Sequence, residues 1–347
     1  MKTTIRNVAE AAGVSAMAVS AVLHGTGRNV KVSEAKAELI RKVARELRYQ
    51  PNHLARSLRN RKTNTIGVVF QHFDRFSDEN PYYPQLLNGI IAALFPAGYT
   101  LALCPQLVQR SGEGAISDGR FDGVLWCRPD FTEQSVEGLR NSSIPVVMMH
   151  APPGSAPGVP TFCVDNDGAL RLPVRHLVEL GHKRIGFVLD HLNEKTAEGR
   201  ARSEAFMLAT QEAGVIGEVL VWDPDAHDLE NYRLGMGPHT ALIAYSDFLA
   251  GRLLAACRRF GLRVPHELSI IGFDSSSFCE TTTPKLTSIY QPVERIAHEA
   301  TMHLLSLIQS DQSNVDADAL PLASIYDCGF DIRESTGPPP ATAKNSS

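Results

Sequence analysis

Residues 4–25 read TIRNVAEAAGVSAMAVSAVLHG, and this stretch decides the fold of the N-terminal part of the chain. Apolar residues recur at helical spacing before Gly13 and again after Ser15, a residue type that caps helices. Gly13 permits the positive φ angle that a tight turn between two helices often requires. A small residue at Ala9, the glycine, and a β-branched residue at Val19 have the spacing of a DNA-reading helix-turn-helix.

The charge of the chain is divided unevenly between this segment and the rest. Residues 1–63 contain 13 lysines and arginines and four glutamates, a net charge of +9, whereas the remaining 284 residues have a net charge of −13. The whole-chain value of −4 therefore conceals a basic head on an acidic body. Because neutralised phosphates release their counterions, a compact basic segment favours nucleic acid as its partner.

Two further segments complete the basic head. A third helix is predicted from Ser33, because apolar residues follow Ile40 at i+3, i+4 and i+7 and close a three-helix bundle. After a break at residues 49–52, residues 53–59 form a short amphipathic segment. A segment of this length is unstable as an isolated helix, so we expect it to fold only against a partner.

The body alternates short β-rich runs with helical stretches, which predicts an α/β fold with parallel sheets flanked by helices. Ligands of such folds bind beyond the carboxyl ends of the strands. The helical stretches include 83–95, 170–180 and 248–260. The predicted strands are 66–70, 101–104, 123–126, 146–149, 185–189, 219–222, 242–244 and 270–273.

Composition and absent motifs narrow the function further. The six cysteines are isolated and no Cys/His cluster has zinc spacing, so we expect free thiols in a reducing cytoplasm, no metal and no cofactor. We also expect no membrane contact, because the N-terminus lacks a signal sequence and no apolar run reaches about 20 residues. The sequence carries no phosphate-binding, nucleophile-elbow or zinc-protease motif, so we do not expect an enzyme.

Residues 4–25, together with VSEAKAELIRKVARELRYQPNHLARSLRNRKTNTIGVV at 32–69, resemble the lactose-repressor/galactose-repressor (LacI/GalR) family of transcription regulators. The resemblance continues through the body in VDNDGALRLPVRHLVELGHKRIGFV at 164–188 and LRVPHELSIIGFDSS at 262–276. It implies an all-α helix-turn-helix head, a two-lobed periplasmic-binding-protein-like body, a homodimer and a pseudo-palindromic DNA operator. The expected domains are the DNA-binding head at 1–50, a hinge helix and linker at 51–63, the effector-binding and dimerisation body at 64–336, and a disordered tail at 337–347.

The resemblance assigns DNA-binding roles in the head. Hinge helices of a dimer pair over the operator centre, with Ala55 at their contact and Leu58 wedged into the minor groove, where unstacking is offset by contacts to bent DNA. The positions of the base readers hold Ala16, Met17 and Ala21, whose apolar groups contact thymine methyls but form no bidentate hydrogen bonds. Met17 as a core residue is the alternative.

Other head residues supply the remaining DNA contacts in this interpretation. Specificity relies on Arg28, Lys31, the hinge and DNA shape, whereas Ser15 and Ser20 contact phosphates and so position the head without specifying a sequence. Thr4, Asn52 and Arg59 complete the expected DNA-binding set.

The resemblance to the LacI/GalR family also assigns effector-binding roles to individual positions of this sequence. Tyr82 and Tyr83 match an aromatic pair that stacks on a ligand, Arg202 matches an arginine that forks onto ligand oxygens, and Asp274 matches a carboxylate that accepts ligand hydroxyl protons. The set also contains Ser246, which stands where an asparagine is usual, and Trp222, for which a core position is equally open. Asp165 and Asn166 near the lobe crossover are as readily structural.

Two alternatives to an effector-controlled repressor stay open. The connection at 223–238 is shorter than usual, which leaves open a regulator with lost or altered effector control whose body is only a dimerisation scaffold. A transport-type sugar-binding protein shares the body fold, but it requires a signal peptide and has no basic head. We favour a repressor whose small-molecule effector, a sugar, binds between the two lobes.

Overall fold

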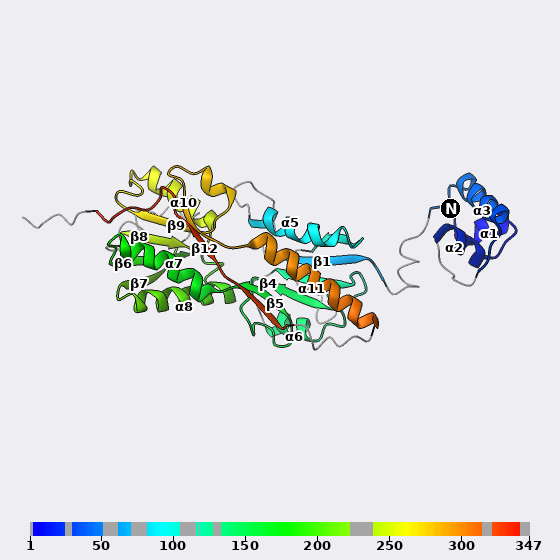
Figure 1. Cartoon of the computed structure of the whole chain (residues 1–347), viewed down its shortest axis with the longest axis horizontal. Helices are drawn as coiled ribbons and strands as arrows, with labels where there is room; N and C mark the ends of the chain where they lie inside the picture. The colour runs from blue at the N-terminus through cyan, green and yellow to red at the C-terminus, as the bar shows by residue number, and fades with distance from the viewer. Residues whose placement is uncertain are drawn as a thin grey trace, which may run out of the picture. The chain divides into compact units, whose positions relative to one another are not determined.

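The computed structural model describes residues 3–24, 30–50, 62–70, 82–104, 116, 118–127, 133–222, 239–313 and 321–340 (Figure 1). The chain divides into two compact units, Met1–Thr63 and Asn64–Ser347, which correspond to the basic head and the acidic body.

The head contains α1 (Ile5–Ala11), α2 (Ala16–His24) and α3 (Glu34–Glu46). Helix α1 begins with a capping box, in which Asn7 N–H donates to Thr4 Oγ1 at 3.4 Å and Thr4 N–H donates to Asn7 Oδ1 at 2.9 Å. Gly13 has a φ of +62°. The shared core of the three helices consists of Val8, Ala9, Ala12, Val19, Ile40, Val43 and Ala44. The predicted three-helix bundle is confirmed.

The first lobe of the body is built on a six-stranded sheet in the order β11-β5-β4-β3-β1-β2, with all neighbouring strands parallel. In Figure 1, α11 (orange) lies beside α5 (cyan). The strands are β1 (Thr65–Phe70), β2 (Thr100–Leu103), β3 (Gly123–Cys127), β4 (Val146–Met149), β5 (Thr161–Val164) and β11 (Ala323–Tyr326). The helices are α5 (Tyr82–Leu94), α6 (Glu133–Arg140) and α11 (Val293–Ser313).

The second lobe is built on a sheet in the order β12-β10-β9-β8-β6-β7, in which only the β10–β12 pair is antiparallel. Its strands are β6 (Arg184–Leu189), β7 (Ile216–Val221), β8 (Ala241–Ala244), β9 (Ser269–Asp274), β10 (Thr287–Tyr290) and β12 (Gly329–Asp331). Its helices are α7 (Asn166–Glu179), α8 (Ala197–Glu212), α10 (Asp247–Arg259) and the 3-10 helix η1 (Ser277–Glu280).

The chain crosses between the lobes three times, from β5 to α7, from β10 to α11, and from β11 to β12. Helix α11 packs closely on α5 because Gly89 has no side chain: a Cβ there would meet the Glu294 carbonyl oxygen. These crossings join the two lobes into one body, which confirms the two-lobed α/β fold that the sequence predicts. The parallel strands direct their carboxyl ends toward the crossings, where ligands of such folds bind.

All eight predicted strands overlap observed strands. Strands β5, β10, β11 and β12 lie outside the predicted set. In β10 the apolar pattern is interrupted by Thr287 and Ser288, whose buried hydroxyls take part in hydrogen bonds with Arg333 and Asp247. Gly337, where we expect the tail to begin, is held by Ser269 and His182, and residues 341–347 lie outside the described residues. Within the described chain, no helix is long and apolar enough to cross a membrane.

Candidate DNA-binding and effector sites

The exposed residues of α2 form the candidate DNA-reading face. Met17 is 66% exposed, which is incompatible with the alternative that it is a core residue. Ala16 is also exposed and Ala21 is half-buried. Ser15 begins the helix, and its Oγ accepts a hydrogen bond from Ala18 N–H at 3.2 Å.

The structure requires one correction in this set. Ser20 is only 4% exposed, so its burial opposes the expected phosphate contact. Ser20 follows the core residue Val19 and is rotated from it by about 100° around the helix axis, so it still lies on the side of α2 that faces the other helices of the head. Thr4, Ser15 and Lys31 are exposed. The other expected DNA-binding residues, Arg28, Asn52, Ala55, Leu58 and Arg59, lie outside the described residues.

The body gathers aromatic side chains where strands of the first lobe end. Tyr83 meets Phe70 edge-on with ring centroids 5.5 Å apart. Tyr82 meets Tyr83 and His150 at 5.4 Å each. Burial raises the pKa of Tyr82 well above its usual value, and the charges of Cys127, Asp274 and other neighbours add to the rise. Asp274 belongs to the second lobe, so the electrostatic environment of Tyr82 includes a residue from each lobe.

Arg202 is held by the protein itself on the second-lobe side. Its Nε lies 3.1 Å from Glu198 Oε1, one helical turn earlier on α8, and its Nη1 donates to the Tyr245 carbonyl oxygen at 2.7 Å. The guanidinium lies 3.6 Å from the ring centroid of Phe273, a cation–π contact. Asn166, the first residue of α7, donates to the same Glu198 oxygen at 3.2 Å. The ion pair is buried, so the charge of Arg202 is compensated before any ligand binds.

Asp274 ends β9 with a φ of +126° and accepts a hydrogen bond from Gln291 Nε2, in the segment that crosses from β10 to α11. Burial, together with the charge of nearby Asp247, raises the pKa of Asp274 to about 8, although Arg202 and the Gln291 hydrogen bond act in the opposite direction. The carboxyl group is therefore largely protonated at neutral pH and can both donate and accept a hydrogen bond to a ligand.

Asp247, the first residue of α10, organises the loop after β9. It is buried and accepts hydrogen bonds from the backbone N–H and hydroxyl of Ser276, from Ser288 Oγ and from Cys279 Sγ. The donors lie in the loop after β9, in η1 and in β10, and Ser276 is only two residues after Asp274 in the chain. Asp247 therefore positions the loop that carries the candidate ligand-binding carboxyl group.

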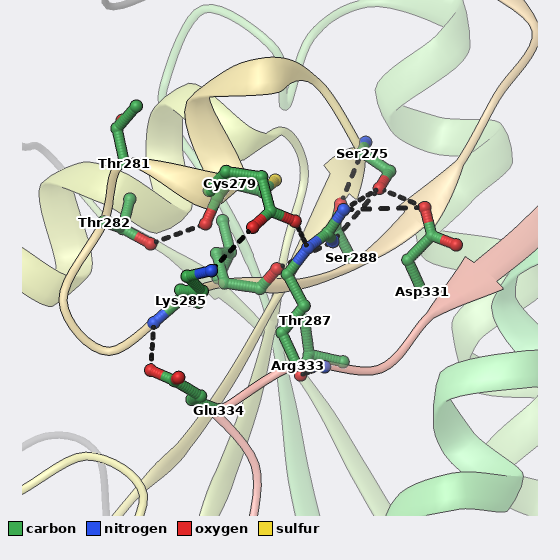
Figure 2. A network of polar contacts seen from close by, with 12 residues as sticks. Ser275, Cys279, Thr281, Thr282, Lys285, Thr287, Ser288, Asp331, Arg333 and Glu334 are labelled. Atoms are coloured by element: carbon green, nitrogen blue, oxygen red, sulfur yellow. Dashed lines mark hydrogen bonds and ion pairs between the residues drawn. The ribbon is translucent and has the colours of Figure 1, made fainter.

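A second polar network fixes the same loop from outside. Figure 2 shows Arg333 reaching Ser275, with guanidinium Nη1 3.2 Å from Ser275 Oγ. The Nε of Arg333 donates to Glu280 Oε1 at 2.6 Å. Ser275 Oγ in turn donates to Asp331 Oδ2 at 2.5 Å. Ser275 has a φ of +47°. The network thus ties the residue after Asp274 to β12 and its continuation.

Several buried polar atoms near the lobe crossings have no hydrogen-bond partner within the described part of the chain. They are both ring nitrogens of His150, Oε2 of Glu198, Oδ1 of Asn166 and Oε1 of Gln291. His150 is 8% exposed and has a φ of +55°. Burial lowers the pKa of His150 to about 3, with a further contribution from Arg202. Buried polar groups normally have partners, so these atoms are candidates for ligand contacts.

The structure separates the expected effector residues into two groups. In the first group, Tyr82 and Tyr83 are in ring contact, and electrostatic interactions link Asp274 to both Tyr82 and Arg202. Ser246 caps α10 through Leu249 N–H at 3.2 Å. Trp222 is 6% exposed and belongs to a core cluster with residues of α10, so the structure favours the core interpretation over ligand stacking.

Sequence reasoning missed most of the site's polar partners. Glu198 has a recognisable signal in its i, i+4 spacing to Arg202, whereas His150 and Gln291 have none, because only the fold brings them near the other residues. The connection at 223–238 lies outside the described residues. Among the side chains that the structure places, no group of three His, Cys, Asp or Glu residues is arranged to hold a metal ion.

A basic helix-turn-helix unit and a two-lobed α/β body with a buried polar site define a class of DNA-binding regulators. Residues 4–52 match the family described as bacterial regulatory proteins, lacI family, and residues 174–326 match the periplasmic binding protein-like domain. The chain is 32% identical over 328 residues to the HTH-type transcriptional repressor PurR of Haemophilus influenzae (strain PittEE), covering 90% of this chain and 93% of the relative. The chain belongs to the lacI family and is a DNA-binding transcription regulator, not an enzyme.

A second relative agrees with this membership, and two solved structures have the same fold. PurR of Aliivibrio salmonicida is 30% identical over 319 residues, covering 88% of this chain and 92% of the relative. The Lac repressor dimer bound to operator and the anti-inducer ONPF superposes with a TM-score of 0.78 at 22% identity, covering 97% and 100% of the two chains. The CelR–cellobiose complex gives a TM-score of 0.67 at 23% identity, covering 96% and 100%. These structures share the fold of this chain.

Proposed function

We propose that this regulator is a cytoplasmic homodimeric repressor that binds a pseudo-palindromic operator and responds to a neutral, hydroxyl-rich effector, a sugar, held between its lobes. The relatives named as transcriptional repressors support repression. The Lac repressor, which has the same fold, is a dimer on its operator, and this supports two-fold symmetry in both protein and DNA.

The observation that carries the effector proposal is the set of buried acceptors near the crossings. Glu198 Oε2, Asn166 Oδ1 and Gln291 Oε1 can only accept hydrogen bonds, and no described residue donates to them. A ligand that satisfies them must bring several donors, as a polyhydroxylated ring does. Tyr82 and Tyr83 supply aromatic faces on which an apolar sugar face packs.

The charge of the site favours a neutral ligand over an anion. The positive charge of Arg202 is compensated by Glu198 at 3.1 Å. The raised pKa of Asp274 leaves that carboxyl group largely protonated at neutral pH, so it adds little negative charge. CelR, which shares the fold, binds the neutral sugar cellobiose, and this supports a neutral sugar here.

Control of DNA binding follows from the two-lobed architecture. A ligand that contacts both Tyr82 and Asp274 stabilises one relative orientation of the lobes and shifts the population toward it. In a dimer, this orientation sets the spacing of the two hinge segments at 51–63 and thereby the operator affinity. Ser15 is exposed and suited to a phosphate contact that positions the head, and the exposed Lys31 is available for the contribution to specificity that the resemblance implies.

Thermal unfolding of the full chain with a panel of neutral sugars and their phosphorylated or uronic acid counterparts tests the effector proposal. A ligand that binds only the folded state raises the melting temperature with concentration, and we expect this from a neutral sugar but not from its anionic counterpart. Asp274→Asn should weaken the response, whereas Asp167→Asn, the same change at an exposed carboxylate of α7, should preserve it.

The same experiment decides between effector control and its loss. If no sugar changes either the melting temperature or the operator affinity, the body is a dimerisation scaffold without effector control, which is the alternative that the short 223–238 connection leaves open. If only anionic ligands stabilise the chain, the assignment of a neutral effector is wrong.

A further inference from the structure

We propose that this regulator reads its operator through the C5-methyl groups of thymine, and that Met17 is the residue that contacts them. The inference rests on the proposed operator binding and adds the chemistry by which bases are distinguished. It concerns α2, the second helix of the helix-turn-helix, which is the element that enters the major groove in DNA-binding proteins of this kind.

The surface of α2 lacks the side chains that normally read bases. Between Ala16 and His24 the helix contains only two hydrogen-bonding side chains, Ser20 and His24. Ser20 is 4% exposed and lies in the bundle. His24 is half-buried in the last turn, with its Nε2 3.4 Å from Tyr49 Oη. Neither is placed at the beginning of α2, where a recognition helix contacts base edges.

What α2 does expose at its beginning is apolar. Met17 projects from the first turn and is 66% exposed, the largest exposed fraction among the large apolar side chains of the described chain. Its neighbours Ala16 and Ala21 are too small to cover it. In water this surface is unfavourable, so contact with an apolar group on DNA would stabilise the complex.

Thymine is the ordinary base that offers an apolar group in the major groove. Guanine, adenine and cytosine are recognised by hydrogen bonds from arginine, asparagine, glutamine or acidic side chains, whereas thymine presents its C5-methyl group. The flexible thioether of methionine adapts its shape to such a group. The exposed Ser15, which precedes α2, is suited to a phosphate contact, which positions the head without distinguishing sequences.

The test replaces single thymines by deoxyuracil in a duplex that the full chain has selected from genomic fragments. Deoxyuracil lacks only the methyl group and keeps base pairing and its O4 acceptor, so any loss of affinity reports on the methyl. With about 0.8 kcal/mol for one buried carbon group, we expect about a fourfold loss at the thymine that faces Met17 in each half-site.

A double-mutant cycle assigns the effect to the side chain. Met17→Ala should bind the thymine and deoxyuracil duplexes equally, because the methyl has lost its contact. Leu39→Ala, a truncation of an exposed apolar residue on α3, should keep the full difference. Both residues are exposed and both replacements favour helix, so the head should fold in each variant.

The outcomes separate this proposal from the proposed function. If no thymine position is sensitive while the chain still prefers the selected duplex over a scrambled one, methyl reading is wrong but operator recognition stands. If Met17→Ala shows the same sensitivity as the unaltered chain, the methyl acts through another residue and the assignment to Met17 is overturned. If the selected and scrambled duplexes bind equally, the proposed operator recognition itself fails.

Discussion

Ser276 donates both its backbone N–H and its hydroxyl to one carboxylate oxygen of Asp247, at 2.8 and 2.9 Å. The two residues belong to different elements: Asp247 begins α10, and Ser276 lies in the loop between β9 and η1. Because Asp274 lies two residues before Ser276, the position of the candidate ligand-binding carboxyl group depends on a buried carboxylate behind it.

Asp247→Asn tests this dependence. An amide oxygen cannot replace the carboxylate toward Ser276, Cys279 and Ser288 together, so buried donors lose partners. We expect the free energy of unfolding to fall by roughly 1–3 kcal/mol and the sugar-induced stabilisation to weaken. Denaturant titration of the full chain measures both, with Asp167→Asn as the exposed control. An unchanged unfolding curve would show that Asp247 does not fix the loop.

The raised pKa of Asp274, about 8 against an ordinary 3.8, predicts a pH dependence of stability. Between these values the folded body retains a proton that the unfolded chain releases, so stability falls as the pH rises through this interval. The slope is at most about 1.4 kcal/mol per pH unit for one proton. Asp274→Asn should flatten it in unfolding measurements from about pH 5 to about pH 8. Parallel curves for the two proteins would contradict the burial of an ionisable group there.

His150 predicts the opposite trend in acid. Burial lowers the pKa of His150 from 6.5 to about 3, so between these values the unfolded chain binds a proton that the folded body does not. Stability therefore falls as the pH decreases from about 6.5 toward about 3. His150→Gln should reduce this acid loss, whereas His191→Gln at an exposed position should not. Equal acid sensitivity of both variants would place the destabilising protonation elsewhere.

The buried pair of Arg202 and Glu198 should show strong coupling. Arg202→Met leaves Glu198 without its cation and should lower the free energy of unfolding by roughly 3–5 kcal/mol. Adding Glu198→Gln should recover much of this loss, which a double-mutant cycle in denaturant measures. The exposed Arg171–Glu212 pair, treated in the same way, should show little coupling. Additive losses at Arg202 and Glu198 would mean that the pair does not act as a unit.

Leu58→Ala tests the wedge assigned to the hinge, which lies outside the described residues. Leu58 acts only in the complex with bent DNA, where the cost of unstacking a base step is offset by several contacts that the bend permits. Its loss should therefore reduce operator affinity roughly tenfold to a hundredfold. Affinity for unrelated DNA at the same salt concentration should stay nearly constant. Equal losses on both DNAs would contradict the wedge.

The sequence predicts the helices and strands that local periodicity encodes, but it does not predict contacts between residues that are distant in sequence. The turn at Gly13, the head core around Val19 and eight strands of the body follow from spacing alone. Arg202 and Asp274 follow from resemblance. A role for His150 could not be predicted from the sequence, because an isolated histidine carries no motif and only the fold places it beside Tyr82.

The burial of some side chains also differs from what their polarity or their position in the sequence predicts. Ser20 is polar but lies within the buried arc of α2, and Ser288 is buried in β10 because its hydroxyl is paired with the Asp247 carboxylate. Trp222 follows a strand end, where ligands often bind, yet it packs into a core cluster with residues of α10. These outcomes depend on side chains distant in sequence, which periodicity does not specify.

The most direct test of the whole account is the selection of genomic DNA fragments by the purified full chain at one stated salt concentration, followed by sequencing. We predict enrichment of a two-fold symmetric site with a deformable central step and thymines placed symmetrically in its half-sites. Recovery of fragments without any shared motif, with and without the stabilising sugar, would contradict a sequence-specific dimeric regulator.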